Sequence, residues 1–481
     1  MQDTQKIAVN DVSPKTKASV FNPGDQDNYD LYQKREKIYQ RYPSGFFQTL
    51  RIATIWVTLG VYFLGPWLSW DGRQAILFDL PERKFYIFGF TFWPQDFLLL
   101  AWLLIIAAFA LFFFTALAGR VWCGYTCPQT VWTTFFMWIE HVTEGDRHQR
   151  IRLDAQPWSK QKIIKKTTKH SAWFALAFFT GFTFVGYFAP IKELGLDLLY
   201  FEAHAWSIFW LAFFSIATYA NAGWLREQVC MYMCPYARFQ SVMFDRDTLI
   251  VTYDEKRGEP RGSRKKKADI STQDLGSCID CKMCVQVCPT GIDIRNGLQY
   301  ECIGCAACID ACDMIMEKMD YPKGLIRYST ENAIEGKKSN ILRPRLIAYG
   351  AVLMVMVITF FIVLFGRVPL EMDIIRDRNQ LYRTTDTGSI ENAYTLKIMN
   401  KTQDEKNYSI ALTGLDGLHL DAPESIRAIP GELVSLSVTA TLSPELLTKP
   451  NNTIEFHLKS IGEEGLEVIE ESRFIGPMPA R

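Results

Sequence analysis

The chain has 481 residues, more than one domain of ordinary size, and 48% of them are hydrophobic and 14% aromatic, which excludes a small soluble protein and favours a membrane protein. The 52 basic and 52 acidic residues cancel overall, but 11 and 18 of them, respectively, lie after Leu370, which leaves 41 and 34 for the rest. A basic body with an acidic tail is expected of a protein whose ends lie on opposite sides of a membrane.

The chain begins with a polar segment and continues with long apolar stretches. Met1 to about Tyr42 lacks the apolar core and cleavage site of a signal peptide, so we expect a cytoplasmic lead-in. Five later stretches are apolar over about 20 residues, the length that a helix needs to cross a bilayer. A sixth, Val131–His141, is short, and we expect it to be interfacial or re-entrant. The five predicted spans are Thr49–Leu68, Phe97–Leu117, Ala172–Pro190, Ala205–Trp224 and Leu346–Phe365.

Basic residues predict how these spans are oriented. The segment His141–Lys169 carries eight Lys and Arg against three acidic residues, and Arg246–Lys267 is also basic. By the positive-inside rule the N-terminus and all the cysteines are then cytoplasmic, and five spans place the acidic tail outside. Between membrane spans, such basic runs are expected to face solvent or lipid headgroups, so membrane lipid is an expected partner and nucleic acid is not.

Eight of the 12 cysteines form two copies of C-x2-C-x2-C-x3-C between Cys278 and Cys312. This spacing is typical of paired 4Fe–4S clusters, in which the last Cys of each copy binds the cluster of the other copy. A zinc site and disulfides are the alternatives, and zinc sites favour paired C-x2-C units. Asp313 stands where the second copy would usually have Pro. We predict that one cluster is bound by Cys278, Cys281, Cys284 and Cys312, and the other by Cys302, Cys305, Cys308 and Cys288.

The other four cysteines form two C-x3-C-P motifs, at Val121–Pro128 and Gln228–Pro235, each after the inner end of a span. On a helix, residues four apart share one face, and the following Pro indicates a fresh helix start that stabilises a thiolate. Paired thiolates are soft ligands that favour Cu(I), zinc or iron–sulfur centres, but the spacing leaves a reversible disulfide or simple packing open. The candidate metal ligands, copper included, are Cys123, Cys127, Cys230 and Cys234, with Met231 and Met233 as further thioether candidates.

The acidic tail alternates between apolar and polar residues, with turn residues between the alternating segments. Its length and spacing predict a β-sandwich of about 100 residues. No dinucleotide-binding or P-loop motif occurs in the chain, so we expect electrons to arrive singly, from a partner protein or a quinol. The predicted strands are Tyr394–Met399, Tyr408–Leu412, Leu433–Thr441, Thr453–Leu458 and Leu466–Ile469.

Two sequence segments carry a family resemblance, V-W-C-G-Y-T-C-P and C-x-Y-M-C-P-Y-A-R-F-Q-S-V-M. With the spans, the double-cluster insert and the C-terminal domain, they resemble the CcoG/FixG/RdxA family of cytochrome c oxidase accessory proteins over nearly the whole chain. The resemblance implies a multi-pass protein of the bacterial inner membrane that reduces Cu(II) to Cu(I) for the copper centre of cbb3-type oxidase. The oxidase assembly factors and a copper transporter or chaperone are the implied partners. The two-span C-x3-C-P unit also resembles NapH and NosR, which are membrane electron-transfer proteins.

We therefore expect a multi-domain integral membrane protein with an α-helical transmembrane bundle, a ferredoxin-like insert with two 4Fe–4S clusters and a C-terminal immunoglobulin-like β-sandwich. The expected function is that of a membrane-bound iron–sulfur oxidoreductase, with cupric reduction as the leading hypothesis and an unidentified electron donor. The alternatives are a quinol-linked conduit of the NapH/NosR type and a non-catalytic assembly factor or redox sensor. The expected domains are a lead-in (1–45), a four-span domain (46–245), the ferredoxin-like domain (246–342), a fifth span (343–368) and a periplasmic β-sandwich (369–481).

Overall fold

The computed structural model describes residues 37–266, 275–367, 370–377, 380–402, 404–447, 449–462 and 467–477. Most of the expected lead-in therefore lies outside the described residues, as do Lys267 of the basic run and Leu466 of the last predicted strand.

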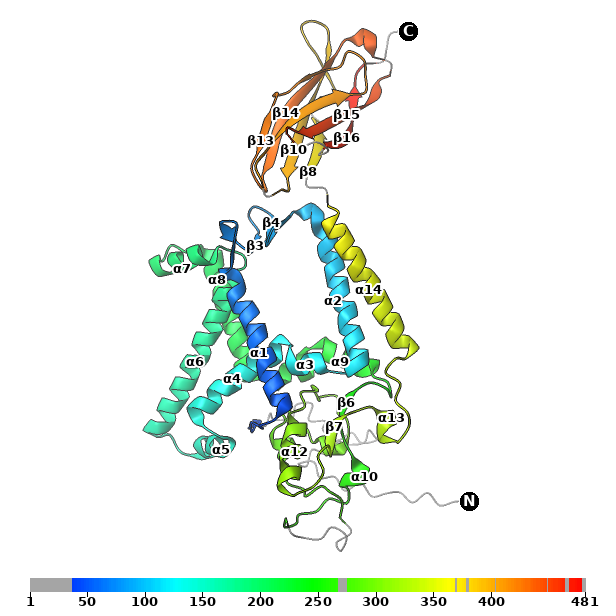
Figure 1. Cartoon of the computed structure of the whole chain (residues 1–481). Coiled ribbons are helices and arrows are strands. Elements are labelled where there is room, and N and C mark those ends of the chain that lie inside the picture. The colour runs from blue at the N-terminus through cyan, green and yellow to red at the C-terminus, as the bar shows by residue number, and fades with distance from the viewer. Residues whose placement is uncertain are drawn as a thin grey trace, which may run out of the picture. The chain divides into compact units, whose positions relative to one another are not determined.

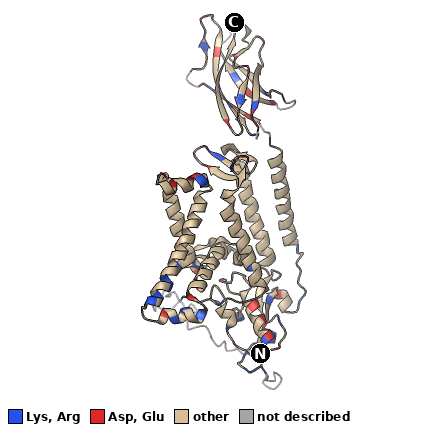
Figure 2. Cartoon of the chain, turned by 60° about the vertical axis from the view of Figure 1, so that its left-hand side comes forward, with Lys and Arg blue, Asp and Glu red and all other residues tan. Residues whose placement is uncertain are grey.

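Four described helical segments are long and apolar enough to cross a membrane, and they correspond to the first, second, fourth and fifth predicted spans. In Figure 2 charged residues are sparse along most of the long helices. In the second and the last of these segments only 6% of the apolar 18-residue stretch is buried, so most of its side chains are free to face lipid. These two helices, α2 and α14, run side by side (Figure 1). The four segments are Phe46–Trp67, Pro94–Ala118, Ala205–Leu225 and Pro344–Phe365.

The third predicted span, Ala172–Pro190, is not among these four segments. Its first part is the second half of α6, a helix that begins at Lys160 and ends at Val185. The first turns of α6 are rich in Lys, which makes this helix less apolar than the four, and Gly186–Pro190 turn into the separate helix α7. Helix α6 packs along α8, which belongs to one of the four segments, and a side chain at Gly181 would lie 2.5 Å from the Ser215 hydroxyl.

The remaining helices of this part are short, and the fourth span changes geometry towards its end. The stretch Val131–His141 belongs to α4, whose Phe136 and Glu140 are fully buried, so it packs inside the protein. Helix α8 passes into two π-helical turns, η3 and η4. Five short strands, β1–β5, connect the first two spans. The helices are α1 (Phe46–Leu64), α2 (Phe97–Ala118), α3 (Val121–Tyr125), α4 (Pro128–Glu144), α5 (Arg147–Ala155), α6 (Lys160–Val185), α7 (Ile191–Tyr200), α8 (Ala205–Thr218), η3 (Tyr219–Leu225), η4 (Val229–Met233), α9 (Pro235–Met243) and α14 (Pro344–Phe365); the strands are β1 (Ser69–Trp70), β2 (Arg73–Gln74), β3 (Ile76–Asp79), β4 (Lys84–Ile87) and β5 (Phe90–Phe92).

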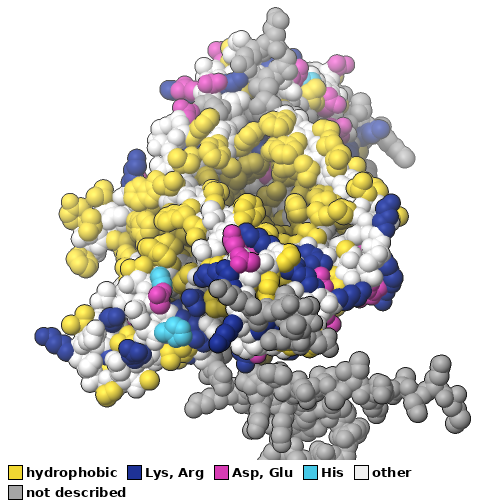
Figure 3. Space-filling view, turned by 60° about the horizontal axis from the view of Figure 1, so that its bottom comes forward, with side chains coloured by type: hydrophobic (Ala, Val, Ile, Leu, Met, Phe, Trp, Pro, Cys, Tyr) yellow, Lys and Arg dark blue, Asp and Glu magenta, His cyan; other side chains and the backbone are white. Residues whose placement is uncertain are grey.

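The surface around the helices matches a membrane boundary. In Figure 3 a broad hydrophobic area gives way to a rim on which Lys and Arg side chains gather. Large exposed apolar side chains such as Leu98, Leu104 and Ile362 contribute to the hydrophobic surface of the spans. Basic side chains beside such a belt are expected at the headgroup level of a bilayer.

Residues 250–266 and 275–334 form a cysteine-rich lobe that is attached to the start of α1. Strands β6 and β7 pair antiparallel, and helices α11 and α12 carry cysteines. The carboxylate of Asp310 in α12 accepts the backbone N–H groups of Phe47 (3.2 Å) and Gln48 (2.7 Å), so the lobe caps the membrane helix α1. Gly45 leaves room for this carboxylate, because a side chain there would overlap it. The elements are β6 (Ile250–Tyr253), α10 (Glu255–Gly258), α11 (Met283–Gln286), η5 (Ile294–Asn296), α12 (Ala307–Lys318), β7 (Ile326–Ser329) and α13 (Glu331–Ile334).

The C-terminal part is a β-sandwich, as the sequence predicts. One sheet has the order β12–β14–β10–β8, with β9 beside β10, and the other has the order β13–β11–β15–β16. Alternate residues of both sheets, including Tyr394, Leu396 and Phe456, form one buried core. All five predicted strands are present, and β8, β9, β12 and β13 are additional. The strands are β8 (Leu370–Arg376), β9 (Arg383–Thr384), β10 (Ile390–Asn400), β11 (Lys406–Thr413), β12 (His419–Asp421), β13 (Ile426–Ala428), β14 (Leu433–Leu442), β15 (Asn451–Ser460) and β16 (Glu467–Ile475).

Candidate iron–sulfur and thiol sites

Two cavities in the cysteine-rich lobe are each surrounded by one set of four cysteines. In both sets the last cysteine of one sequence copy joins the first three of the other copy, which is the pairing that the spacing predicts. Cys284 of the first cavity also lines the second, so the two cavities are neighbours. The first cavity is lined by Cys278, Cys281, Cys284 and Cys312, and the second by Cys288, Cys302, Cys305 and Cys308.

Tight loops hold these cysteines in place. Asp280 (φ 51°) and Lys282 (φ 54°) lie in the left-handed region within the first motif, and Gly304 (φ 66°) and Ala306 (φ 58°) within the second. Each of these two loops ends at the start of a helix, the first at α11 and the second at α12. Short loops of this kind turn successive cysteines of one copy toward a common centre. The cysteine that reaches across to the other cavity lies just after α11 in the first copy (Cys288) and on α12 in the second (Cys312).

The donor chemistry fits iron–sulfur clusters. Among the described residues, no three His, Cys, Asp or Glu side chains are close enough to hold a single metal ion. Each set of four thiols instead surrounds an apolar space, as a cubane with four iron corners requires. Burial raises the pKa of both Cys284 and Cys302 to about 12, so the apolar cavities by themselves favour the protonated thiols. Iron binding by these eight residues stays a prediction.

The four remaining cysteines, Cys123, Cys127, Cys230 and Cys234, lie close together, and we call them the thiol quartet. Burial first, and then Cys127 and Cys230, raise the pKa of Cys123 to about 12. Burial, followed by Cys127 and Cys234, does the same for Cys230. In each motif, a cysteine of the other motif raises the pKa of one thiol. The folded chain therefore brings together two motifs that are far apart in sequence.

The expectation that each pair shares one face of a helix is wrong. Helix α3 ends at Tyr125, so Cys123 lies on α3 while Cys127 precedes α4 in an extended conformation. Cys230 lies on the π-helical turn η4, and Cys234 precedes α9. The physical reason is the following Pro, which cannot continue a helix but is well suited to start one.

The predicted helix start after each motif is present, at Pro128 and Pro235. Burial raises the pKa of Cys127, although the backbone N–H groups of Gln129 and Thr130 in the first turn of α4 act in the opposite direction. The helix N-terminus therefore favours the thiolate as expected, but burial has the larger effect. Met231 is half-buried and Met233 is 61% exposed, so the structure gives the thioethers no special position beside the quartet.

The thiol quartet lies directly against the second cavity. Gly124 follows Cys123, and a side chain at Gly124 would lie 2.9 Å from the Cα atom of Cys305 and 3.0 Å from its backbone nitrogen. Cys123 itself packs against the apolar cluster that contains Ile303 and Cys305. Two glycines make this approach possible, because a side chain at Gly304 would in turn lie 3.2 Å from the backbone of Arg120.

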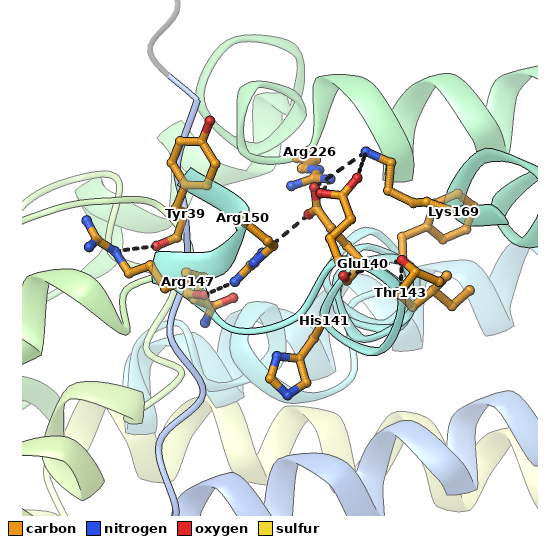
Figure 4. Close-up of polar contacts among 12 residues, drawn as sticks. Tyr39, Glu140, His141, Thr143, Arg147, Arg150, Lys169 and Arg226 are labelled. Carbon is orange, nitrogen blue, oxygen red and sulfur yellow. Dashed lines mark hydrogen bonds and ion pairs between the residues drawn. The ribbon is translucent and has the colours of Figure 1, made fainter. Parts of the chain in front are cut away.

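A buried ion network that the sequence did not reveal supports the quartet (Figure 4). Glu140 of α4 is fully buried and its carboxylate faces Arg226 (3.0 Å), Arg150 (3.4 Å) and Lys169 (3.7 Å). Arg226 lies between the π-helical turns η3 and η4, in the left-handed region (φ 48°), and it leads to Cys230. One residue in the sequence could have indicated this ion network, namely the acidic Glu140 in the mainly apolar stretch that was expected to be interfacial or re-entrant.

Helices that can span a membrane, two cysteine-lined cavities and a neighbouring thiol quartet define a membrane-bound protein of the iron–sulfur electron-transfer class. Comparisons with known proteins agree. A 4Fe-4S dicluster domain model matches residues 225–331, a 4Fe-4S binding domain model matches residues 100–143, and the model for the Ig-like fold at the C-terminal of FixG matches residues 360–477.

Similar proteins extend the match to nearly the whole chain. Nitrogen fixation protein FixG from Rhizobium meliloti is 36% identical, with 95% of each chain covered. Protein RdxB from Cereibacter sphaeroides is 41% identical over 87% of this chain and 90% of its own. A solved structure of a FixG-related protein from Vibrio parahaemolyticus is 36% identical and covers 22% of this chain and 95% of its own, with a TM-score of 0.21. The chain therefore belongs to the FixG/RdxA family.

Proposed function

We propose that this protein is a membrane metalloreductase that reduces Cu(II) to Cu(I) at or near the thiol quartet, for assembly of a cbb3-type cytochrome oxidase. The observation that carries the proposal is the contact between Gly124 of the first C-x3-C-P motif and the Cys305 loop of the second cavity. It brings soft sulfur ligands next to a candidate source of single electrons.

Iron–sulfur clusters, when bound, accept and release one electron at a time. The reduction of Cu(II) to Cu(I) takes one electron and breaks no bond in the chain. The eight cysteines of the lobe would hold the clusters, and the apolar walls of their cavities would keep water away. Cysteines of the thiol quartet would hold the product, because thiolates prefer Cu(I).

The membrane part supports a defined orientation. We place the cysteine-rich lobe and the thiol quartet on the cytoplasmic side, since the Lys-rich start of α6 belongs on the inner face by the positive-inside rule. The β-sandwich is then periplasmic, because α14 leads from the lobe to the sandwich. A copper transporter or chaperone and the oxidase assembly factors are the partners that this role needs, together with an electron donor.

The test is Cu(II) reduction by the full-length protein, which is purified without oxygen, reconstituted in lipid vesicles, reduced chemically and then freed of excess reductant before Cu(II) is added. Replacing all four quartet cysteines by Ser is expected to abolish Cu(I) formation and to leave the iron content unchanged. Tyr232→Phe is the matched control, since Tyr232 lies within the second motif and its side chain is 71% exposed. Undiminished Cu(I) formation by the fourfold Ser variant would remove the quartet from the reaction.

A further inference from the structure

The two cavities of the cysteine-rich lobe differ in the charges beside them. The side of the second cavity carries Arg120, which is 6% exposed and lies between α2 and α3. Its guanidinium donates to the backbone carbonyls of Tyr300, Ala237 and Cys302 (3.4 Å for the last). An arginine stays protonated in proteins, and these acceptors carry no formal charge. Within the described part of the chain, no carboxylate pairs with this buried cation.

The first cavity has the opposite surroundings. Arg295 and Lys282 line it, but the Arg295 guanidinium pairs with Asp280 and with Asp293, at 2.6 Å each, so these two basic residues are matched by two carboxylates. Asp313 follows Cys312 and adds a further carboxylate, which accepts the backbone N–H of Gly324 at 2.8 Å. This is the residue that replaces the usual Pro of the motif.

The two cavities also differ in their access to solvent and to the thiol quartet. Cys281 of the first cavity is the exposed member of the 12 cysteines. Cys305 of the second cavity is buried and touches the quartet through Gly124. A donor protein can therefore approach the first cavity, while the second lies next to the metal-binding sulfurs.

Charge next to a cluster sets its reduction potential, because reduction adds a negative charge to it. A nearby cation stabilises the reduced form and raises the potential, and a nearby carboxylate lowers it. Buried charges act strongly, since little water or salt screens them.

We propose that Arg120 is a positioning residue for electron delivery. Its charge raises the reduction potential of the cluster site at Cys288, Cys302, Cys305 and Cys308 above that of the first cluster site, so that electrons leave from this second site toward the thiol quartet. The inference rests on the proposed function for the identity of the acceptor. With clusters held by the eight cysteines of the lobe, one electron from a donor near Cys281 would be available beside the thiol quartet, where Cu(II) would take it up. No proton or covalent bond changes place in the chain. Arg120 acts through its charge and through the three carbonyls that it holds.

The experiment is a redox titration of the full-length protein, purified without oxygen and without copper, with the reduced clusters followed by EPR. Two different midpoint potentials are expected. Arg120→Gln should lower the higher one and leave the other unchanged, while Arg120→Lys should keep it close to the original value. Asp313→Asn should raise the lower midpoint only. The matched control is Arg257→Gln, since Arg257 also donates to backbone carbonyls, those of Pro322 and Lys323, but in an exposed position; neither midpoint should move.

The proposal is overturned if Arg120→Gln and Asp313→Asn move the same midpoint, or if Arg120→Gln moves neither while its iron content is intact. If Arg120→Gln fails to retain iron, Asp313→Asn decides the order of the sites by itself, since a shift of the higher midpoint, or of neither, contradicts the proposal. Because the titration contains no copper, failure of Cu(II) reduction with unchanged midpoints would refute the proposed function and leave this inference standing.

Discussion

The cysteine-rich lobe and the thiol quartet both derive from a duplicated cysteine motif, but the chain builds them in different ways. In the lobe, tight loops of consecutive residues orient the cysteines around each cavity. In the quartet, each motif is divided by a helix break, and its two halves meet through the packing of α3, α4 and the π-helical turns. Substitutions in the loops of the lobe should therefore disturb its cavities, whereas the geometry of the quartet should also change when residues that pack against α3, α4 or the π-helical turns are replaced.

The largest expected effect is in the lobe itself. Cys305→Ala removes one ligand of the second cavity, and the iron content should fall to about half, because each set of four cysteines serves its own cluster. Cys281→Ala should have the same effect through the first cavity. Iron analysis and EPR of the reduced proteins measure both. If either substitution removed all the iron while the lobe stayed folded, the two cavities would not be independent sites.

The next effect concerns the support of the quartet. Glu140→Gln leaves Arg150, Lys169 and Arg226 without the carboxylate that they share, and breaking such a buried pair costs about 3–5 kcal/mol. We expect a lower unfolding temperature in detergent and faster reaction of Cys230 with a thiol reagent. The absorbance of the clusters should stay the same at low temperature.

The matched control for Glu140 is Glu405→Gln, which removes an ion pair with Arg427 on the exposed surface of the β-sandwich. This change should leave both the unfolding temperature and the reactivity of Cys230 as they were. Equal behaviour of the two variants would contradict a supporting role for the ion network.

A smaller effect is expected at the contact between the two regions. Gly124→Ala introduces a side chain 2.9 Å from the Cα atom of Cys305, and since backbone atoms cannot move aside, overpacking should cost about 1–3 kcal/mol. Electron delivery to Cu(II) should slow, while both clusters are retained. The control is Gly60→Ala on α1, where a side chain meets nothing within 4 Å, so that stability should stay the same or rise. If Gly124→Ala and Gly60→Ala slowed electron delivery to Cu(II) equally, the contact between Gly124 and Cys305 would have no specific role in it.

The smallest effect concerns the cap of α1. Asp310→Asn replaces the carboxylate that accepts the N–H groups of Phe47 and Gln48 with a neutral amide, and we expect a loss of about 1 kcal/mol or less. Hydrogen exchange should become faster in the first turn of α1 only. Asp146→Asn is the control, since Asp146 caps α5 from within its own sequence, and its replacement should affect α5 alone. Unchanged exchange in α1 would mean that the carboxylate contributes nothing to the cap.

The sequence was informative where structure is local. The spacing of the eight cysteines predicted which four would surround each cavity, and alternation predicted five of the sandwich strands. It failed where a helix break or distant segments decide the outcome. The Pro after Cys127 divides a pair that looked helical. The network around Glu140 draws its partners from α5, α6 and the turn at Arg226, so no local pattern could reveal it.

The cap that Asp310 provides has a consequence for biogenesis. Phe47 leaves the ribosome 263 residues before Asp310 does, so the first membrane helix is synthesised long before its N-terminal amides find their acceptor. Asp310 lies between Cys308 and Cys312, and cofactor insertion into the lobe would fix the position of all three. Cofactor loading would thus help to place this acceptor, and a chain that never receives iron would leave the N-terminal amides of its first helix more open to water.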